Sequence, residues 1–337
     1  MMRKWQKILL SVLGTIIGIL LLIVLVFQLS PRPGAMVIGH LFNGPIEIMD
    51  AATYEKAKPQ VEVKRDIGYQ SQYSKANYDL YFPKAQKGKK IPVLVWVHGG
   101  GYVAGSKEGV KEFATRIAAD AQIAVVAMNY QTAPDLQYPG QVIQTEELIA
   151  DLKNHDQGLD LKRLFFGGDS AGAQIALQYT ATQTNQKYAN EVGISQQLSP
   201  KVLKGVISYC GPVDLQQMAT QQSDSLFMKF FVRTVAWSLI GTKNWQNSPL
   251  LRQASLVKQL TTDFPPAYVT DGNAFSFQNQ GIALVKRLKE LNVPAQGLFF
   301  DQVEKEVTHE YQFNYQTAEA KRCYEETLAF LLAQLGS

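Results

Sequence analysis

The feature that most constrains the fold is a five-residue motif, Gly168-Asp169-Ser170-Ala171-Gly172, between two predicted elements. The apolar residues Leu164–Phe166 before it predict a short buried strand, and Ala171–Gln183 after it predict a helix. A turn sharp enough to join the two holds the central serine in strained backbone geometry, so the residues two before and two after it must lack side chains. The motif therefore predicts a strand–turn–helix unit that projects a nucleophilic Ser170 from the carboxyl edge of a sheet, above a helix N-terminus.

Strands and helices alternate around this unit. This order predicts an α/β fold with a mostly parallel central sheet and helices on both of its faces. The predicted strands are Val61–Ile67, Asn77–Phe82, Ile91–Val97, Ile123–Met128, Leu164–Phe166, Val206–Tyr209, Ala267–Thr270 and Gly297–Phe300. The predicted helices are Ile46–Lys58, Val110–Asp120, Pro139–His155, Ala171–Gln183, Gln278–Leu291 and Ala318–Leu335.

Residues 214–265 do not follow the alternation. They carry five aromatic side chains with no strand partner, at Phe227, Phe230, Phe231, Trp237 and Trp245. We interpret the segment as a mostly helical cap insertion that lies over the strand ends and walls a pocket. The alternative is ordinary core, because aromatic residues at helical spacing usually pack inward.

A long apolar run near the N-terminus predicts a membrane anchor. Residues Ile8–Phe27 are apolar apart from Ser11, Gly14, Thr15 and Gly18. Twenty residues at about 1.5 Å each span roughly 30 Å, the thickness of the hydrocarbon core of a bilayer. A cleaved signal peptide is the alternative, but its apolar core has about 7–15 residues and ends in a small-x-small site. This run is longer and ends in Gln28-Leu29-Ser30-Pro31.

Charge around the run predicts its orientation. Arg3, Lys4 and Lys7 precede it, and Arg32 is the only basic residue close behind. The positive-inside rule then predicts a single-pass protein of the cell membrane, with its N-terminus in the cytoplasm and the catalytic domain outside. We expect residues 1–30 to be the anchor, 31–60 a juxtamembrane segment and 61–337 the folded domain. Secretion after signal cleavage is the alternative.

Composition excludes other classes of protein. Lys plus Arg is 33 and Asp plus Glu is 29, which gives a net charge of +4, and three of these charges precede the apolar run. The remainder is about +1 and predicts no nucleic-acid partner. The only two cysteines, Cys210 and Cys323, form no disulfide framework and lack metal-ligand spacing. We expect buried free thiols, although the sequence leaves a bridge between them possible.

A second glycine motif, His98-Gly99-Gly100-Gly101, directly follows the strand Ile91–Val97. Acyl transfer passes through an oxyanion, and glycines let backbone N–H groups approach that oxygen without obstruction. We expect Gly100, Gly101 and Ala171 to supply these N–H groups, and His98 to fix the shape of the loop. A phosphate-binding loop is the alternative, but the lysine of a P-loop is missing.

The general base must be a histidine, and the chain has four. Only His309 follows the final strand, as the chain order serine, acid, histidine requires. The acid should follow the strand Ala267–Thr270, which favours Asp271, while Asp214 after an earlier strand is a second candidate. Both aspartates also suit ordinary turns.

These motifs, with Tyr130-Gln131-Thr132-Ala133-Pro134 between them, resemble the hormone-sensitive-lipase-like branch of the α/β-hydrolases over roughly residues 75–335. The resemblance implies the α/β-hydrolase fold, a Ser–His–acid triad, a helical cap and small acyl esters as substrates. The chain departs from the family at the acid, because the family's usual position falls near Asn273 to Phe275, where no residue is acidic. Asp271 would then have to serve from slightly earlier.

The prediction is a serine esterase that uses Ser170, His309 and Asp271 on a small-molecule ester, with no metal or organic cofactor. Two alternatives stay open. One is a membrane-tethered ligand-binding protein on a non-catalytic hydrolase scaffold, since some relatives in this family are ligand receptors. The other is a peptidase of related fold. The sequence predicts neither the acyl and alcohol groups nor the oligomeric state.

Overall fold

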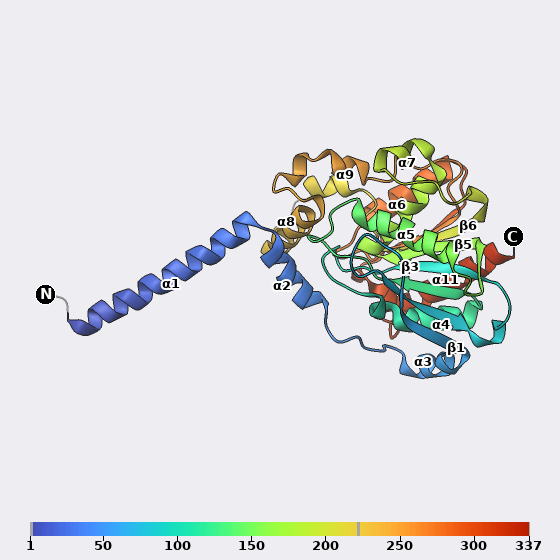
Figure 1. The fold of residues 1–337 in the computed structure, drawn as a ribbon, viewed down its shortest axis with the longest axis horizontal. Helices are drawn as coiled ribbons and strands as arrows, with labels where there is room; N and C mark the ends of the chain where they lie inside the picture. Colours follow the sequence, from blue (N-terminus) through green and yellow to red (C-terminus); the bar gives the residue numbers. More distant parts are fainter. Residues whose placement is uncertain (1–2, 221–222, 337) are drawn as a thin grey trace.

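The computed structural model describes residues 3–220 and 223–336, so residues 1–2, 221–222 and 337 of the ranges above lie outside the described part. Eight strands form one sheet in the order β1-β2-β4-β3-β5-β6-β7-β8 (Figure 1). Strands β1 and β2 pair antiparallel, β2 pairs antiparallel with β4, and all other neighbours are parallel. Their bounds are β1 Val61–Gly68, β2 Asn77–Pro83, β3 Ile91–Val97, β4 Ala124–Met128, β5 Leu159–Asp169, β6 Leu203–Tyr209, β7 Ala267–Thr270 and β8 Ala295–Leu298.

Helices cover both faces of this sheet, as predicted. The main helices are α4 Lys111–Ala121, α5 Gly140–Asn154, α6 Ala171–Thr184, α7 Gln186–Val192, α10 Gln278–Glu290 and α11 Ala318–Leu335. Strand β3 is buried throughout because alternate side chains enter the two halves of the core. Leu94 and Trp96 pack on the side of α4 and α11, whereas Val93 and Val95 pack on the side of α5, α6 and α10.

The segment over the strand ends is mostly helical within its described residues. It contains the short 3₁₀ turns Leu215–Ala219 and Trp245–Asn247 and the helices α8 Leu226–Ile240 and α9 Pro249–Gln253. The C-terminal half of α8 is buried, whereas Leu226 and Phe227 at its start are exposed. The segment therefore contributes to the core and also covers the strand ends.

The N-terminal elements differ most from the prediction. The predicted helix Ile46–Lys58 is the shorter α3 Ala51–Ala57, because the Asp50 carboxylate accepts the Thr53 N–H and caps the helix there. A further helix, α2 Arg32–Phe42, was not predicted. The prediction for the last strand was also displaced: β8 ends at Leu298, and residues 299–300 have already left the sheet.

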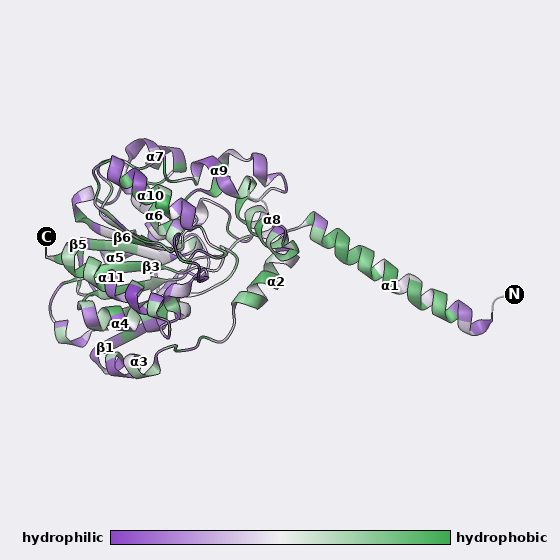
Figure 2. Cartoon of the chain, turned by 180° about the vertical axis from the view of Figure 1, so that it is seen from behind, coloured by the Kyte–Doolittle hydropathy of each residue, from purple (hydrophilic) through white to green (hydrophobic). Residues whose placement is uncertain are grey.

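A single long helix, α1 Lys4–Leu29, projects from the body and has no buried residue (Figure 1). Its side chains are apolar along almost its whole length, with hydrophilic residues at its N-terminal end (Figure 2). Among the described residues it is the one helix long and apolar enough to cross a membrane. Only its last turn meets the body: Phe27 packs near Phe230 of α8, and Arg233 donates to Gln28 at 2.9 Å.

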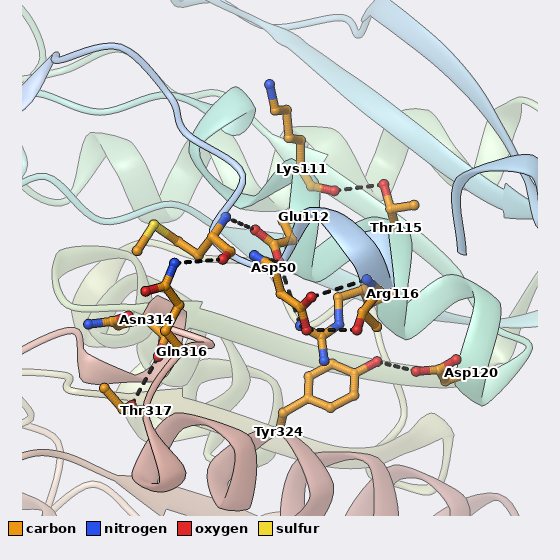
Figure 3. A network of polar contacts seen from close by, with 12 residues as sticks. Asp50, Lys111, Glu112, Thr115, Arg116, Asp120, Asn314, Gln316, Thr317 and Tyr324 are labelled. Carbon is orange, nitrogen blue, oxygen red and sulfur yellow. Dashed lines mark hydrogen bonds and ion pairs between the residues drawn. The ribbon is translucent and has the colours of Figure 1, made fainter. Parts of the chain in front are cut away.

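A polar network ties the segment before α3 to the body (Figure 3). Glu112 accepts the backbone N–H groups of Met49 and Asp50 at 2.6 and 3.0 Å. The guanidinium of Arg116 lies 3.5 Å from Glu112 and 4.2 Å from the ring centroids of both Tyr315 and Tyr324. The chain between α2 and α3 is therefore held at both ends, by α8 at one end and by α4 at the other.

Candidate active site

Ser170 sits on the turn between β5 and α6 with φ 48° and ψ −119°, a conformation that non-glycine residues rarely adopt. The flanking glycines are required by space. A Cβ on Gly168 would lie 2.5 Å from the backbone of Gly172, and one on Gly172 would lie 2.0 Å from the carbonyl oxygen of Val97. The turn is therefore packed directly against the end of β3.

The loop after β3 brings backbone donors to the same place. Gly100 and Gly101 have positive φ values of 111° and 58°, and a Cβ on Gly100 would lie 2.2 Å from the carbonyl oxygen of Ala104. Within the part of the chain that the structure describes, the N–H groups of Gly100, Gly101 and Ala171 donate to no protein acceptor. All three residues line the cavity that contains Ser170. Such unpaired N–H groups are suited to a developing negative charge.

Buried polar groups hold this loop. The Asp169 carboxylate accepts from the Gly99 N–H at 2.7 Å and from Trp96 Nε1 at 2.8 Å, which joins the two glycine motifs. Burial and the nearby Glu310 raise the pKa of Asp169 to about 7. His98 Nδ1 lies 2.7 Å from the Gly99 carbonyl oxygen and must be the donor there, because a carbonyl only accepts. Burial lowers the pKa of His98 to about 4, so it is neutral near pH 7.

His309 lies beside the serine. Its Nε2 is 3.1 Å from Ser170 Oγ, and its Nδ1 is 3.5 Å from Asp271 Oδ1, which is long for a hydrogen bond. Asp271 is buried at the end of β7, and its two oxygens accept the N–H groups of Gly272 at 2.8 Å and Phe277 at 2.7 Å. The carboxylate is therefore fixed by its own loop and faces the imidazole.

The pKa of His309 reflects this placement. Burial disfavours the charged imidazolium, but the carboxylates of Asp271, Glu310 and Asp169 outweigh burial and raise the pKa of His309 above its usual 6.5.

Asp214, the second candidate for the acid, and Asn273, near the family's usual acid position, make other contacts. Asp214 caps the 3₁₀ turn Leu215–Ala219, accepting from the Gln216 N–H and from the Ser255 hydroxyl. Asn273 donates to three loop carbonyls, Phe300, Val303 and Lys305, and accepts from the Val307 N–H. The amide at the family's usual acid position therefore organises the loop that leads to His309.

A comparison with known proteins identifies the family of this chain. The protein family described as alpha/beta hydrolase fold matches residues 94–312. The chain belongs to this family. The predicted resemblance to the hormone-sensitive-lipase-like esterase branch is confirmed by the family match together with the named relatives and neighbours that follow.

The curated relatives of this α/β-hydrolase align with only part of this chain and with only part of their own length. An esterase of Gibberella moniliformis is 23% identical over 68% of this chain and 71% of its own length. An ethyl acetate hydrolase of Pseudomonas putida is 23% identical over 60% of this chain and 62% of its own length. A putative alpha/beta hydrolase of a mimivirus of Acanthamoeba polyphaga is 28% identical, and the match spans 29% of that protein.

Solved structures agree in fold. Esterase B of Lactobacillus rhamnosis superposes with a TM-score of 0.70 at 20% identity, covering 90% of this chain and 96% of that one. A Pyrobaculum calidifontis esterase gives 0.65 at 19% identity, covering 91% and 92%. The predicted α/β-hydrolase fold is thereby confirmed, and the named esterases agree with the predicted class, a carboxylic ester hydrolase.

The cavity that Ser170 and His309 line has a volume of about 480 Å³ and is mostly apolar. Residues from four separate segments line it. Phe227 and Phe231 of α8 belong to the predicted cap, whereas the sequence did not indicate Phe42 of α2, Phe275 and Phe277 after β7, or Glu310. Phe277 also packs its ring edge-on to the imidazole of His309, with centroids 5.5 Å apart. Glu310 directly follows His309 and has φ 61°, which turns the chain at this point.

A metal at this site would compete with the hydrogen bonds already made. Donor atoms of Cys210, Asp271 and His309 lie within 4.8 Å of one another. However, burial raises the pKa of the Cys210 thiol well above its usual value, and both Asp271 oxygens already accept N–H groups. The residues therefore fit a hydrolytic triad better than a metal centre. Both cysteines are free and buried, as expected.

Proposed function

We propose that this α/β-hydrolase is a membrane-anchored serine esterase that cleaves carboxylic esters with Ser170 as nucleophile and His309 as general base. One observation carries the proposal: His309 Nε2 lies 3.1 Å from Ser170 Oγ, in a cavity also lined by three residues whose N–H groups find no acceptor among the described residues. A serine hydroxyl is a weak nucleophile unless a positioned base removes its proton during attack. Here His309 is within reach of the Ser170 hydroxyl, and the residues that carry the unpaired N–H groups line the same cavity.

The reaction proceeds in two halves. Ser170 Oγ attacks the ester carbonyl carbon while His309 takes the hydroxyl proton, and the resulting oxyanion accepts from the N–H groups of Gly100, Gly101 and Ala171. As the carbon–oxygen bond breaks, His309 returns the proton to the leaving alcohol. Water then attacks the acyl-enzyme with His309 again as base, and the acid leaves as Ser170 regains its proton.

Asp271 is the proposed acid of the triad. It holds the Nδ1 side of His309 and favours the imidazolium that forms during attack. The separation of 3.5 Å is compatible with this role, because catalytic hydrogen bonds are often long before substrate binds.

The proposed substrates are esters with a short acyl group, such as acetate. The cavity of about 480 Å³ is at the small end of ligand sites, and its aromatic lining suits an apolar ester. Named relatives and neighbours that act on small esters support this class, namely the ethyl acetate hydrolase of P. putida and a bacterial heroin esterase.

The proposed location is a membrane, with α1 as an uncleaved anchor and the catalytic domain on the outer side. The length and apolar surface of α1 support the anchor, although a signal sequence would have the same properties. The contacts of Phe27 and Gln28 with α8 favour retention, because they give the end of α1 a place on the folded body.

A fluorophosphonate probe tests the catalytic proposal. We expect stoichiometric labelling of the folded full chain and none in Ser170→Ala, with hydrolysis of p-nitrophenyl acetate lost in the same variant. Absence of labelling in folded wild type would favour the ligand-binding alternative. Faster turnover of peptide amides than of esters would favour the peptidase.

A further inference from the structure

Exposed apolar side chains lie on three segments that also contribute lining residues to the active-site cavity. On α2 and α8, Met36 and Leu226 are 75% and 81% exposed, and Phe275 after β7 is 75% exposed. Other members of this face also reach solvent, and three of its residues line the cavity as well: Phe42, Phe227 and Phe275. We define the α2–α8 face as Met36, Val37, Leu41, Phe42, Leu226, Phe227 and Phe275. Exposed apolar side chains that gather on neighbouring elements of a folded domain mark interaction surfaces.

Helix α2 is two-sided in a way that presents this face. It buries Gly34, Ala35 and Ile38, with Gly34 lying against Thr234 of α8, and leaves Met36, Val37 and Leu41 in solvent. Packing on the body therefore explains only one side of the helix. The other side is apolar, as in helices that lie in the plane of a membrane interface.

The position of α1 identifies the partner of the face. Helix α1 ends at Leu29 and α2 begins at Arg32, so the intervening two residues can separate them by no more than about 10 Å. Figures 1 and 2 both show α2 and α8 at the end of the body from which α1 projects. A bilayer spanned by α1 would lie directly against this end.

We propose that the α2–α8 face is a membrane-docking surface, seated on the leaflet from which α1 emerges. In that position the cavity mouth opens onto the leaflet, and Ser170 receives esters dissolved in the bilayer, namely short acyl groups on lipophilic alcohols. The inference rests on the proposed function in two respects, the anchor and the hydrolysis of esters. A second copy of the chain on the same face is the competing occupant.

Docking is tested first without reference to catalysis. The full chain is reconstituted in phosphatidylcholine vesicles with an environment-sensitive fluorophore on Leu226→Cys or, as matched control, on Leu332→Cys of α11. Leu332 is 47% exposed and lies towards the C-terminal end of the chain, which Figure 1 shows on the far side of the body from α1. The native cysteines are buried and should label slowly.

We expect nitroxide-labelled lipid to quench the fluorophore at position 226 at least about threefold more than at position 332. Equal quenching at the two positions would overturn the proposal. Quenching at position 226 that depends on protein density in the vesicle, and not on the lipid label, would instead assign the face to a second copy.

Substrate access is tested with two esters that share one acyl group. Hexadecyl acetate resides in the vesicle, whereas p-nitrophenyl acetate is soluble in water, and both give the same acetyl-enzyme. In the double variant Met36→Glu and Leu226→Glu, we expect turnover of hexadecyl acetate to fall at least about tenfold and that of the soluble ester to stay within about twofold. Leu332→Glu should change neither.

Unchanged turnover of hexadecyl acetate in the double variant would contradict the proposal. A wild type that hydrolyses neither ester and resists the fluorophosphonate would refute the proposed esterase, while the quenching measurement would still decide docking. The two failures are therefore distinguishable.

Discussion

The Asp271 carboxylate controls the basicity of His309, and this gives a residue-level test of the triad. We expect Asp271→Asn to reduce kcat by about 10²–10⁴-fold, the upper value being that of the chymotrypsin-type triad. Because Asp271 is among the groups that raise the pKa of His309, its removal should also move the acidic limb of the pH–rate profile to lower pH. His309 acts as base only when neutral, so activity is lost as pH falls through its pKa.

The matched control is Asp214→Asn, since Asp214 caps a turn away from the imidazole. Its kcat and its pH profile should resemble those of the wild type. If Asp214→Asn were the inactive variant and Asp271→Asn were active, the assignment of the acid would be wrong.

Glu310 gives the cavity a carboxylate that the proposed mechanism does not use. Its side chain lies beside Gly99, where an added Cβ would come within 3.1 Å of Glu310 Oε1. The negative charge of the Glu310 carboxylate, in a mostly apolar cavity, disfavours binding of negatively charged substrates. We expect Glu310→Gln to raise kcat/KM for esters that carry a carboxylate by about three- to tenfold, on the order of 1 kcal/mol, and to change it little for neutral esters.

The same variant has a second readout. Glu310 contributes to the raised pKa of His309, so Glu310→Gln should shift the acidic limb to lower pH while leaving the maximum rate near that of the wild type. Glu306→Gln, at an exposed position of the preceding loop, is the control. Equal gains for neutral and anionic esters would show that the charge of Glu310 does not select substrates.

At the scale of elements, the contact of α2 with α8 depends on one glycine. A Cβ at Gly34 would lie 2.7 Å from both Oγ1 and Cγ2 of Thr234, whereas one at Gly39 of the same helix would meet nothing closer than 3.8 Å. Alanine is favoured over glycine within a helix by about 0.5–1 kcal/mol. Gly39→Ala should therefore stabilise α2 by about this amount, and Gly34→Ala should destabilise its packing by about 1–3 kcal/mol.

The measurement is limited proteolysis of the exposed segment 43–47, which should be cut faster when α2 leaves α8. We expect faster cleavage in Gly34→Ala and slower cleavage in Gly39→Ala than in the wild type. The same direction of change in both variants would mean that helix propensity, not the contact with Thr234, decides the position of α2.

Local sequence explains which elements were predictable. Ile91–Val97 and Ala267–Thr270 are contiguous apolar runs and have the predicted bounds as β3 and β7, as Ala318–Leu335 does as α11. Helix α2 was missed because Pro31, Pro33 and Gly34 resemble a break, although proline suits the first turn of a helix. Its buried side packs on α8, which lies about 190 residues later in the chain.

The same distinction holds for the site. Ser170 and the glycines of the two motifs stand out locally, because sharp turns and open N–H groups require particular residues at fixed spacing. Phe277 and Glu310 have no such signal. Their approach to His309 depends on a loop that is fixed by Asn273 and on the positive φ of Glu310, and the local sequence pattern specifies neither. The acid of the triad was only partly predictable, because the position of Asp271 after a strand suits the acid but also suits an ordinary turn.

For the whole molecule, we propose that the charge at the start of α1 decides on which side of the membrane the catalytic domain lies. Arg3 precedes α1 and Lys4 and Lys7 lie in its first turn, and orientation depends on basic residues within about 15–20 positions of a span. Replacing all three by glutamine should remove the bias that, in the proposed orientation, keeps the N-terminus in the cytoplasm. We expect the fraction of chains with an outward catalytic domain to fall by at least about half.

A membrane-impermeant maleimide measures this fraction in intact cells that carry Val303→Cys, because Val303 is 47% exposed and the native cysteines are buried. Replacing Lys87, Lys89 and Lys90 by glutamine removes the same charge from a loop more than 50 residues beyond α1, and should leave labelling unchanged. If both triple variants reduced labelling equally, net charge and not its position would be the cause. If the wild type were labelled only after lysis, the active site would face the cytoplasm, and the docking surface would lie on the inner leaflet.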